Sequence, residues 1–324
     1  MEKIDVVIPW VDGSDPKWKK KKEEYQSKAS LSTNDEMVSQ NRYDDYGTLK
    51  YLMRSIEENM PWVGNVFLLT DNQMPKWLNK KNVKVVDHVN FIKGSLPTFN
   101  SNVIMMNLHN IPGLAERFVL LNDDYIIWSK TSERDFFVGD LPVDILVESG
   151  TVPKIDGFFH ISQNGVALMN DFFNKRDVIK NNFSKFFSLK YGLTIVRTVI
   201  SLPYGGFLGF LNPHLAIPYT RQDFFQFETN FPDAIQTTNA HRFREPTDIN
   251  DWAVRYFRNL EGRFVPGKLK GKFLTTSQFS RDVTVSNTEQ IVVINDDNHA
   301  TEADIGRVIS FLEAKFARKS KYEL

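Results

Sequence analysis

Apolar runs that end in acidic or amide residues recur along this chain, and they constrain its fold more than any other feature. Two of these runs are Phe118–Leu121 and Ile291–Ile294. The residues that follow them are Asn122, Asp123 and Asp124 in the first case and Asn295, Asp296 and Asp297 in the second. Each run has the length and composition of a buried strand. The pattern therefore predicts carboxylates at the carboxyl ends of strands, where open α/β sheets bind ligands.

Further strands alternate with helical patterns through the first part of the chain. Ile4–Val11, Val66–Leu69 and Val83–Val86 are short apolar runs typical of strands. Between them, apolar residues follow helical spacing from Tyr46 to Met60. Strands that alternate with helices predict an α/β fold with a mostly parallel sheet flanked by helices. We expect a helical, Phe-rich insertion in the middle of the chain.

Composition excludes several classes of protein. The 324 residues include no cysteine, which excludes disulfides, thiolate metal sites and cysteine nucleophiles. Forty basic residues balance forty acidic ones, so no nucleic-acid partner is expected. No uninterrupted apolar stretch reaches roughly 18 residues, and the N-terminus lacks the pattern of a signal peptide. We therefore expect a cytoplasmic protein without a transmembrane helix.

The two acidic strand ends suit a hard divalent cation. Mg²⁺ or Mn²⁺ prefers oxygen ligands and often shares them with a phosphate. The expected metal ligands are Asp123, Asp124, Asp296 and Asp297. A simple turn explains either motif alone, because Asn and Asp favour turns. The occurrence of two such ends favours a functional site, and it indicates an enzyme that acts on a nucleotide-activated substrate.

Other residues extend the candidate site. Imidazole is the usual general base near neutral pH, which makes His214 a candidate, although a lone histidine is more often structural. Arg244 would clamp phosphate oxygens, unless its loop is simply solvated. A turn after the first strand would offer backbone N–H groups to a phosphate or a uracil edge, or it is an ordinary strand-to-helix turn. The residues expected to bind the substrate are Asp12, Gly13, Ser14, Asp15, Asn122 and Arg242.

At these residues the chain resembles the Stealth family of sugar-1-phosphate transferases, which build bacterial capsular polysaccharides. The animal lysosomal-enzyme N-acetylglucosamine-1-phosphotransferase is similar in the same blocks. The matching motifs include Trp10-Val11-Asp12-Gly13-Ser14-Asp15-Pro16, Pro61-Trp62-Val63, Thr70-Asp71-Asn72-Gln73, Leu96-Pro97-Thr98-Phe99-Asn100-Ser101-Asn102, Asn122-Asp123-Asp124, Pro213-His214, Arg242-Phe243-Arg244 and Asn295-Asp296-Asp297.

The resemblance implies a glycosyltransferase-like (GT-A-like) core, a UDP-sugar donor and a divalent cation. It implies catalytic roles for Asp124, His214 and Arg244, and a role for one acid of the pair at 296 and 297. Two positions depart from the family pattern. Thr48 stands where the family often has an acidic residue, and Met105 stands where it usually has Glu.

With this resemblance, the chain divides into three predicted parts. Residues 1–130 would form the nucleotide-sugar-binding half, and residues 212–324 would complete the catalytic core. Residues 131–211 would form the insertion. Basic and aromatic residues mix within residues 172–210, which predicts contact with a membrane surface at the inner face of the cell membrane. An acceptor site, a partly buried subdomain and a contact between copies remain open.

The expected reaction is transfer of a hexose-1-phosphate or N-acetylhexosamine-1-phosphate from a UDP-sugar to a glycan hydroxyl, with release of UMP. The acceptor would be a growing glycan on a lipid carrier. His214 would take the acceptor proton, Arg244 would hold a phosphate, and the cation near Asp124 would neutralise charge. Two alternatives remain open. One is a metal-dependent glycosyltransferase that releases UDP, and the other is a non-catalytic glycan- or nucleotide-binding protein.

Overall fold

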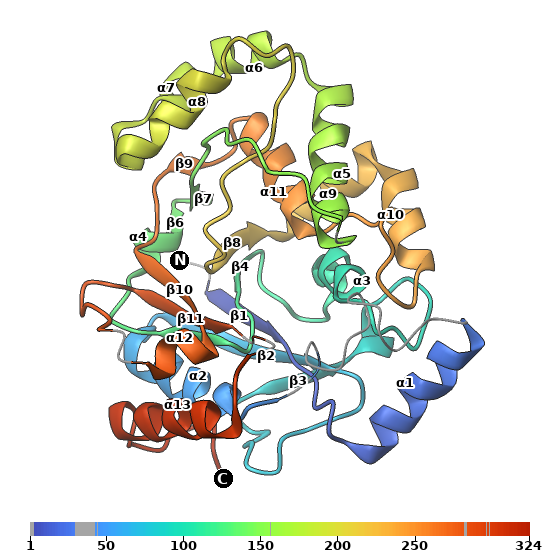
Figure 1. Cartoon of the computed structure of the whole chain (residues 1–324), viewed down its shortest axis with the longest axis vertical. Helices are drawn as coiled ribbons and strands as arrows, with labels where there is room; N and C mark the ends of the chain where they lie inside the picture. Colours follow the sequence, from blue (N-terminus) through green and yellow to red (C-terminus); the bar gives the residue numbers. More distant parts are fainter. Residues whose placement is uncertain are drawn as a thin grey trace.

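A five-stranded sheet lies at the centre of the molecule, in the strand order β3-β2-β1-β4-β8 (Figure 1). Its strands are β1 (Ile4–Pro9), β2 (Val63–Thr70), β3 (Lys84–Asp87), β4 (Arg117–Leu120) and β8 (Ile217–Thr220). The first four strands are parallel, and β8 runs antiparallel to β4. The computed structural model describes residues 3–29, 43, 45–155, 157–281, 284–295, 297 and 299–324.

Alternate side chains of the central strands supply two cores, one on each face of the sheet. In β1, Val7 packs into one core with Phe67 and Phe118. Its neighbours Val6 and Ile8 pack into the other core. Successive side chains of a strand point to opposite faces, so a strand covered on both faces reads as a continuous apolar run. The predicted α/β class with a mostly parallel sheet flanked by helices is therefore confirmed.

Helices cover both faces of this sheet (Figure 1). The predicted helix between the first two strands is α2 (Thr48–Asn59), and its buried apolar stripe belongs to the core of Val6 and Ile8. The opposite core receives side chains from α3 (Ser101–Met106), α5 (Gly157–Phe172), α9 (Arg221–Asn230), α10 (Pro232–Ala240) and α11 (Asp251–Leu260). Many of the phenylalanines are buried in this second core, among them Phe224, Phe227 and Phe257.

A second, three-stranded sheet is joined to the first by residues 121–124. It has the order β10-β11-β5, with β10 (Gly271–Thr275), β11 (Ile291–Asn295) and β5 (Tyr125–Ile127). The strand predicted before Asn295 is thus present, and it pairs antiparallel with the strand that follows Asp124. The helices α12 (Thr276–Ser280) and α13 (Glu302–Lys315) contribute to its core. The two acidic strand ends therefore belong to adjoining sheets.

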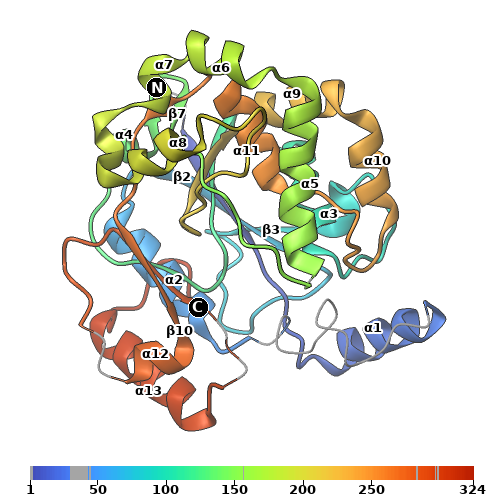
Figure 2. The ribbon, with the colours of Figure 1, turned by 45° about the horizontal axis from the view of Figure 1, so that its top comes forward.

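The middle of the chain combines short strands with helices. A small sheet contains β6 (Phe137–Val138), β7 (Leu141–Asp144) and β9 (Val265–Pro266). After α5 come α6 (Lys175–Asn181), α7 (Phe183–Phe186), η4 (Leu189–Thr194) and α8 (Ile195–Ser201). Figures 1 and 2 show α6, α7 and α8 together at one end of the molecule, whereas α1 (Pro16–Lys28) lies at its periphery. Within the described residues, no helix has the length and apolar character needed to cross a membrane.

Candidate active site

A cavity of about 1140 Å³ lies beyond the carboxyl ends of β1, β2, β3 and β4. Residues one or two positions beyond the ends of these strands line it, namely Trp10, Asp71, His88 and Asn122. The loop before β8, the start of α11 and the segment after β11 also contribute to the lining. A volume of this size accommodates a ligand larger than most drug-sized molecules. The cavity therefore occupies the position that an open α/β sheet offers to its ligand.

Asp123 and Asp124 enter the cavity from the short link between the two sheets. The link is held on both sides, because the N–H of Leu121 donates to the carbonyl of Val7 (3.0 Å) and the N–H of Ile294 donates to the carbonyl of Asp124 (3.0 Å). Thr48 adds a hydrogen bond from its Oγ1 to the carbonyl of Asp123 (3.1 Å). The position where the family often carries an acid thus supports the backbone of the acidic loop.

The carboxylates in this part of the cavity repel one another. Desolvation raises the pKa of Asp123 well above its ordinary value, and the charges of Asp124 and Asp45 raise it further. Asp45 lines the same cavity, and burial raises its pKa as well. Asp45 accepts hydrogen bonds from the N–H of Gly47 (2.7 Å) and from Nε1 of Trp10 (3.1 Å). Sequence reasoning missed Asp45, because no strand-end pattern marks it.

Crowded carboxylates at a cavity wall fit a divalent cation, although the described residues contain no cluster of three or more His, Asp or Glu placed to hold one. Mg²⁺ is commonly held by one or two carboxylates, with waters and substrate phosphates as its other ligands. Asp123 and Asp124 match that mode, since cation binding would offset the repulsion that raises the pKa of Asp123. The expected cation remains a proposal.

The second acidic strand end contributes Asp297 to the cavity. Its carboxylate accepts hydrogen bonds from the N–H of Ser277 (3.0 Å) and of His299 (2.8 Å). Partial burial raises its pKa, but these hydrogen bonds outweigh that effect, and the resulting pKa is lowered. Asp297 is therefore ionised at neutral pH. Asp296, also expected as a metal ligand, lies outside the described residues.

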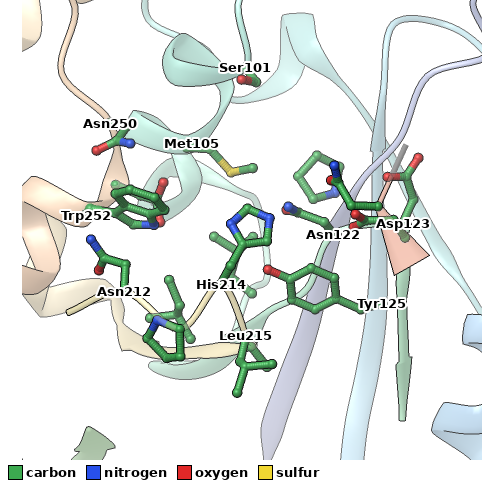
Figure 3. A pocket seen from close by; sticks show the side chains of 18 of the residues that line it. Ser101, Met105, Asn122, Asp123, Tyr125, Asn212, His214, Leu215, Asn250 and Trp252 are labelled. Atoms are coloured by element: carbon green, nitrogen blue, oxygen red, sulfur yellow. The ribbon is translucent and has the colours of Figure 1, made fainter. Parts of the chain in front are cut away.

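His214 enters the cavity from the loop before β8 and faces Asn122 and Tyr125 across it (Figure 3). Its φ of 53° lies in the left-handed region, which is costly for a residue with a side chain and is often found at functional sites. Its ring contacts the edges or faces of Tyr125, Trp252 and Phe273, with centroid distances of 6.1, 6.4 and 5.1 Å. Burial lowers its pKa, so the imidazole is neutral at pH 7 and able to accept a proton.

A buried ionic network holds the loop that carries His214. Asn212 accepts a hydrogen bond from Nη1 of Arg255 (2.7 Å), and its amide donates to the hydroxyl of Tyr256. Nε of Arg255 in turn donates to Asp144 (2.8 Å), and Arg258 pairs with the same carboxylate. Asp144, Asn212 and Arg255 also line the cavity. Sequence reasoning missed this network, because its members come from β7, a loop and α11.

Arg244 lines the cavity, and its Nη2 donates to Oγ of Ser101 (2.6 Å) at the start of α3. The buried carboxylate of Asp248 anchors its loop by accepting hydrogen bonds from the N–H of Glu245 (3.0 Å) and from the amide of Asn100 (2.7 Å). Arg242 is placed differently. Its guanidinium lies over the ring of Tyr25, 5.2 Å from the centroid, and it is absent from the cavity lining.

The turn after β1 lies outside the cavity lining, and its expected contact with the substrate stays a prediction. Asp12, Gly13, Ser14 and Asp15 are absent from the cavity lining. Their N–H groups, expected to contact a phosphate or a uracil edge, donate to acceptors inside the protein. These acceptors are Gln73 Oε1, the carbonyl of Tyr43, the carboxylate of Asp12 and the carbonyl of Asp12. Asp15 also caps α1. The turn thus has a structural role in this conformation.

Sequence reasoning also missed Asp251, the first residue of α11. Asp251 lines the cavity, and its carboxylate accepts a hydrogen bond from the hydroxyl of Tyr219 (2.9 Å). Burial raises the pKa of Asp251 to about 6, despite this hydrogen bond. Nothing in the local sequence distinguishes it from an ordinary first-turn aspartate. A carboxylic acid that titrates close to neutrality thus lies in the same cavity as His214.

Comparison with known proteins identifies the family. Three family models match, described as Stealth protein conserved region 1 (residues 2–29), conserved region 2 (residues 42–142) and conserved region 3 (residues 213–252). The chain is also 34% identical to a capsular polysaccharide phosphotransferase WcwK of Streptococcus pneumoniae, over 100% of this chain and 98% of the relative. The chain belongs to the Stealth protein family.

Other Stealth relatives carry similar names. An exopolysaccharide phosphotransferase, cps2G of Lactiplantibacillus plantarum, is 35% identical over 99% of this chain and 96% of its own length. A receptor polysaccharide phosphotransferase, WefC of Streptococcus oralis, is 35% identical over 91% of each chain. The expectation that this chain is a phosphotransferase is confirmed. Among solved structures, the galactosyltransferase LgtC in complex with donor and acceptor sugar analogs is similar to this chain. The structural match covers 98% of this chain and 98% of LgtC, with 9% sequence identity and a TM-score of 0.41.

The matched Stealth regions contribute different walls of the cavity. Region 2 contains Asp45 and the acidic loop with Asp123 and Asp124. Region 3 contains His214 and Arg244. Asp297 lies beyond the three matched regions, and its expected role as a metal ligand stays a prediction. The structure therefore brings together Asn122, Asp123, Asp124, His214, Arg244 and Asp297, whereas Asp12, Gly13, Ser14, Asp15 and Arg242 lie outside the lining.

Proposed function

We propose that this Stealth protein transfers a hexose-1-phosphate or N-acetylhexosamine-1-phosphate from a UDP-sugar to a hydroxyl of a glycan acceptor and releases UMP. The product would contribute to a capsular or other cell-surface polysaccharide. The observation that carries the proposal is one cavity that joins Asp124, His214 and Arg244 from separate parts of the chain. The names of the relatives, which are polysaccharide phosphotransferases, support the same class of reaction.

The donor nucleotide would lie over the carboxyl ends of β1, β2 and β3. Trp10, Asp71 and His88 line the cavity there. Burial lowers the pKa of His88 to about 4, so its ring is neutral and able to hydrogen-bond without adding charge. In this position the pyrophosphate of the donor would reach the acidic loop after β4. The sugar would extend toward the loop of His214.

The reaction itself exchanges one phosphorus–oxygen bond for another. The acceptor hydroxyl oxygen attacks the β-phosphorus, and the bond from that phosphorus to the oxygen bridging it to UMP breaks. The neutral imidazole of His214 accepts the hydroxyl proton, and UMP leaves with the electron pair of the broken bond. The bond between the sugar and its phosphate stays intact, so the anomeric configuration is kept. Most catalysis of this kind is positioning and charge stabilisation.

Two groups would balance the negative charge on the phosphate oxygens, a guanidinium and a divalent cation. Arg244, held by Ser101 and by the loop around Asp248, would bind phosphate oxygens through its guanidinium. Asp123 and Asp124 would hold Mg²⁺ or Mn²⁺, which supplies charge neutralisation when it is bound. Asp297 would extend this ligand set from the other sheet. The positions of these residues at the wall of one cavity support the proposed roles.

Product analysis tests the proposal. The purified protein is incubated with Mg²⁺, a glycan acceptor and each of a panel of UDP-sugars, and the released nucleotide is identified by ion-exchange chromatography. The proposal predicts UMP together with a phosphodiester-linked glycan. Release of UDP would overturn it in favour of glycosyl transfer at the anomeric carbon. Release of neither nucleotide with any donor would favour the non-catalytic binding protein.

A matched pair of variants connects the reaction to the cavity. Asp124→Ala removes a carboxylate at the acidic loop and is expected to lower kcat at least a hundredfold while the protein stays folded by circular dichroism. Asp140→Ala makes the same chemical change at an exposed position and should leave kcat unchanged. Equal kcat values for the two variants would exclude Asp124 from the reaction.

The acceptor is proposed to be a growing glycan on a lipid carrier, and the protein is proposed to act at the cytoplasmic face of the membrane.

A further inference from the structure

The segment from Leu189 to Tyr204 exposes most of its apolar side chains to solvent, whereas Tyr191 is buried. Leu189 and Leu193 are 90% and 91% exposed, and Ile200 is 68% exposed. We define the apolar ridge as Leu189, Leu193, Val196, Val199, Ile200, Leu202 and Tyr204, all of which are exposed. Monomeric soluble proteins rarely expose a large contiguous apolar patch, and such patches mark interaction sites. The ridge is therefore a candidate contact surface.

Within this segment, the buried residues of α8 are the hydroxyl residues Thr198 and Ser201, which is the reverse of an ordinary surface helix. Thr198 is fully buried, and its Oγ1 accepts a hydrogen bond from the N–H of Glu148 (3.0 Å). Ser201 is also buried, and its carbonyl accepts a hydrogen bond from Nζ of Lys175 (2.6 Å). The hydroxyl residues of α8 thus face the protein while Val196, Val199 and Ile200 face outward. Packing against the rest of the chain does not explain this pattern.

The charged residues of the segment that carries the ridge have one sign. No acidic residue occurs between Asp177 and Asp223, whereas Lys180, Lys190 and Arg197 in this interval are exposed. Lys185 is different, because its Nζ donates to the carbonyls of Gly262 and Phe264. This placement excludes Lys185 from the contact surface that the sequence predicted over residues 172–210. Lys190 and Arg197 are exposed beside the ridge, although Nη1 of Arg197 also donates to Oγ of Ser149 (3.1 Å).

The ridge is also the outer side of one wall of the cavity. Thr194, between Leu193 and Val196, lines the cavity. Tyr191 and Ile195 pack on Ile145 and Leu211, which line it as well. Both views place α8 with α6 and α7 at one end of the molecule, and Figure 1 shows α13 at the opposite end. A surface touched by the ridge would therefore lie next to the cavity.

We propose that the apolar ridge docks this protein on an anionic lipid bilayer, with its apolar side chains in the interface and Lys190 and Arg197 against acidic headgroups. Apolar side chains combined with basic residues bind membrane surfaces in this way. A second copy of the chain is a poorer occupant. A symmetric ridge-to-ridge contact would bring Lys190 and Arg197 of both copies together with no acid from the segment to offset them. The delivery of a lipid-linked acceptor to the cavity rests on the proposed function, but docking does not.

Vesicle sedimentation tests docking with neither donor nor acceptor present. The full chain is mixed with vesicles of phosphatidylcholine alone or with about 30 mol % phosphatidylglycerol. We expect partition into the anionic vesicles, and we expect Leu193→Ser with Ile200→Ser to reduce that partition at least tenfold. Val89→Ser changes another exposed apolar side chain, 67% exposed and near the β3 edge of the sheet, and should have no effect.

Charge variants separate headgroup attraction from nonspecific adhesion. Lys190→Glu with Arg197→Glu should abolish the preference for anionic vesicles, whereas Lys80→Glu with Lys81→Glu, an equal charge change at exposed residues elsewhere, should keep it. Circular dichroism confirms that each variant is folded. Equal vesicle binding by wild type and the ridge variants would overturn the proposal. Sedimentation of the wild type as a dimer that the ridge variants dissociate would also overturn it, in favour of a contact between copies.

Discussion

Replacement of Asp144 by Asn should destabilise the protein and disorder the loop that carries His214. Asp144 is buried, and its carboxylate pairs with both Arg255 and Arg258 while it accepts a hydrogen bond from the amide of Asn259 (3.1 Å). Burial raises the pKa of Asp144, but the charge and hydrogen bonds of Arg255 outweigh this effect, and the pKa is lowered. Asn has the same shape but no charge. Asp144→Asn thus removes the negative charge that balances the two buried guanidinium groups of Arg255 and Arg258.

The size of this effect follows from the burial of the pair. Removing one partner of a buried ion pair typically costs about 3–5 kcal/mol. With an unfolding entropy of about 2.1 cal/mol/K per residue, this cost corresponds to a fall in Tm of about 4–7 °C for a chain of this length. Because the folded-state pKa is lowered, the carboxylate stabilises the wild type above its ordinary pKa of 3.8, and this contribution is lost as the pH falls. The difference in Tm should therefore shrink in acid.

Differential scanning calorimetry at neutral and acidic pH measures both effects. Asp171→Asn removes an exposed carboxylate and should change stability by less than about 0.5 kcal/mol. Asp144→Asn should also lower kcat, because Arg255 bonded to Asp144 holds Asn212 beside His214. A neutral-pH Tm equal to that of the wild type would show that the network does not stabilise this wall of the cavity.

Two further predictions concern ionisable groups in the cavity. Burial lowers the pKa of His214, so the acidic limb of the wild-type pH–kcat profile should lie below pH 6.5. His214→Gln should remove that limb and nearly all turnover. A wild-type limb above pH 6.5 would contradict the assignment of His214 as the base. Because the pKa of Asp123 is raised, the stability that its protonated form contributes is present at low pH and is lost as the pH rises through that pKa. Asp123→Asn should therefore raise Tm at neutral pH in metal-free buffer, and it should abolish transfer. An unchanged or lower Tm would argue against repulsion between the carboxylates.

The sequence predicted the elements whose patterns are local. Continuous apolar runs such as Phe118–Leu121 identify strands covered on both faces, and the stripe of α2 identifies a helix on one face. The acidic ends at Asp124 and Asp297 were visible for the same reason, since each directly follows such a run. His214 and Arg244 were recognised by the resemblance of their motifs. The structure places all four at one cavity.

Residues that tertiary contacts assemble could not be predicted in this way. Asp144 and Arg255 are far apart in sequence, and neither stands in a distinctive local pattern. Asp45 acquires its raised pKa from burial, which no sequence pattern records. At residues 12–15, the N–H groups of Asp12 and Gly13 donate to Gln73 and Tyr43, and the local sequence does not show these distant acceptors. The inward-facing hydroxyls of α8 likewise became visible only in three dimensions.

The fate of the donor's β-phosphate tests the proposed reaction most directly. A UDP-sugar labelled with radioactive phosphorus at that position is incubated with the protein, Mg²⁺ and a glycan acceptor, and the products are separated by chromatography. Transfer of a sugar phosphate predicts that the label moves to the glycan and that the released UMP is unlabelled. Label that remains entirely with the nucleotide, as UDP, while the glycan gains a sugar would contradict the account.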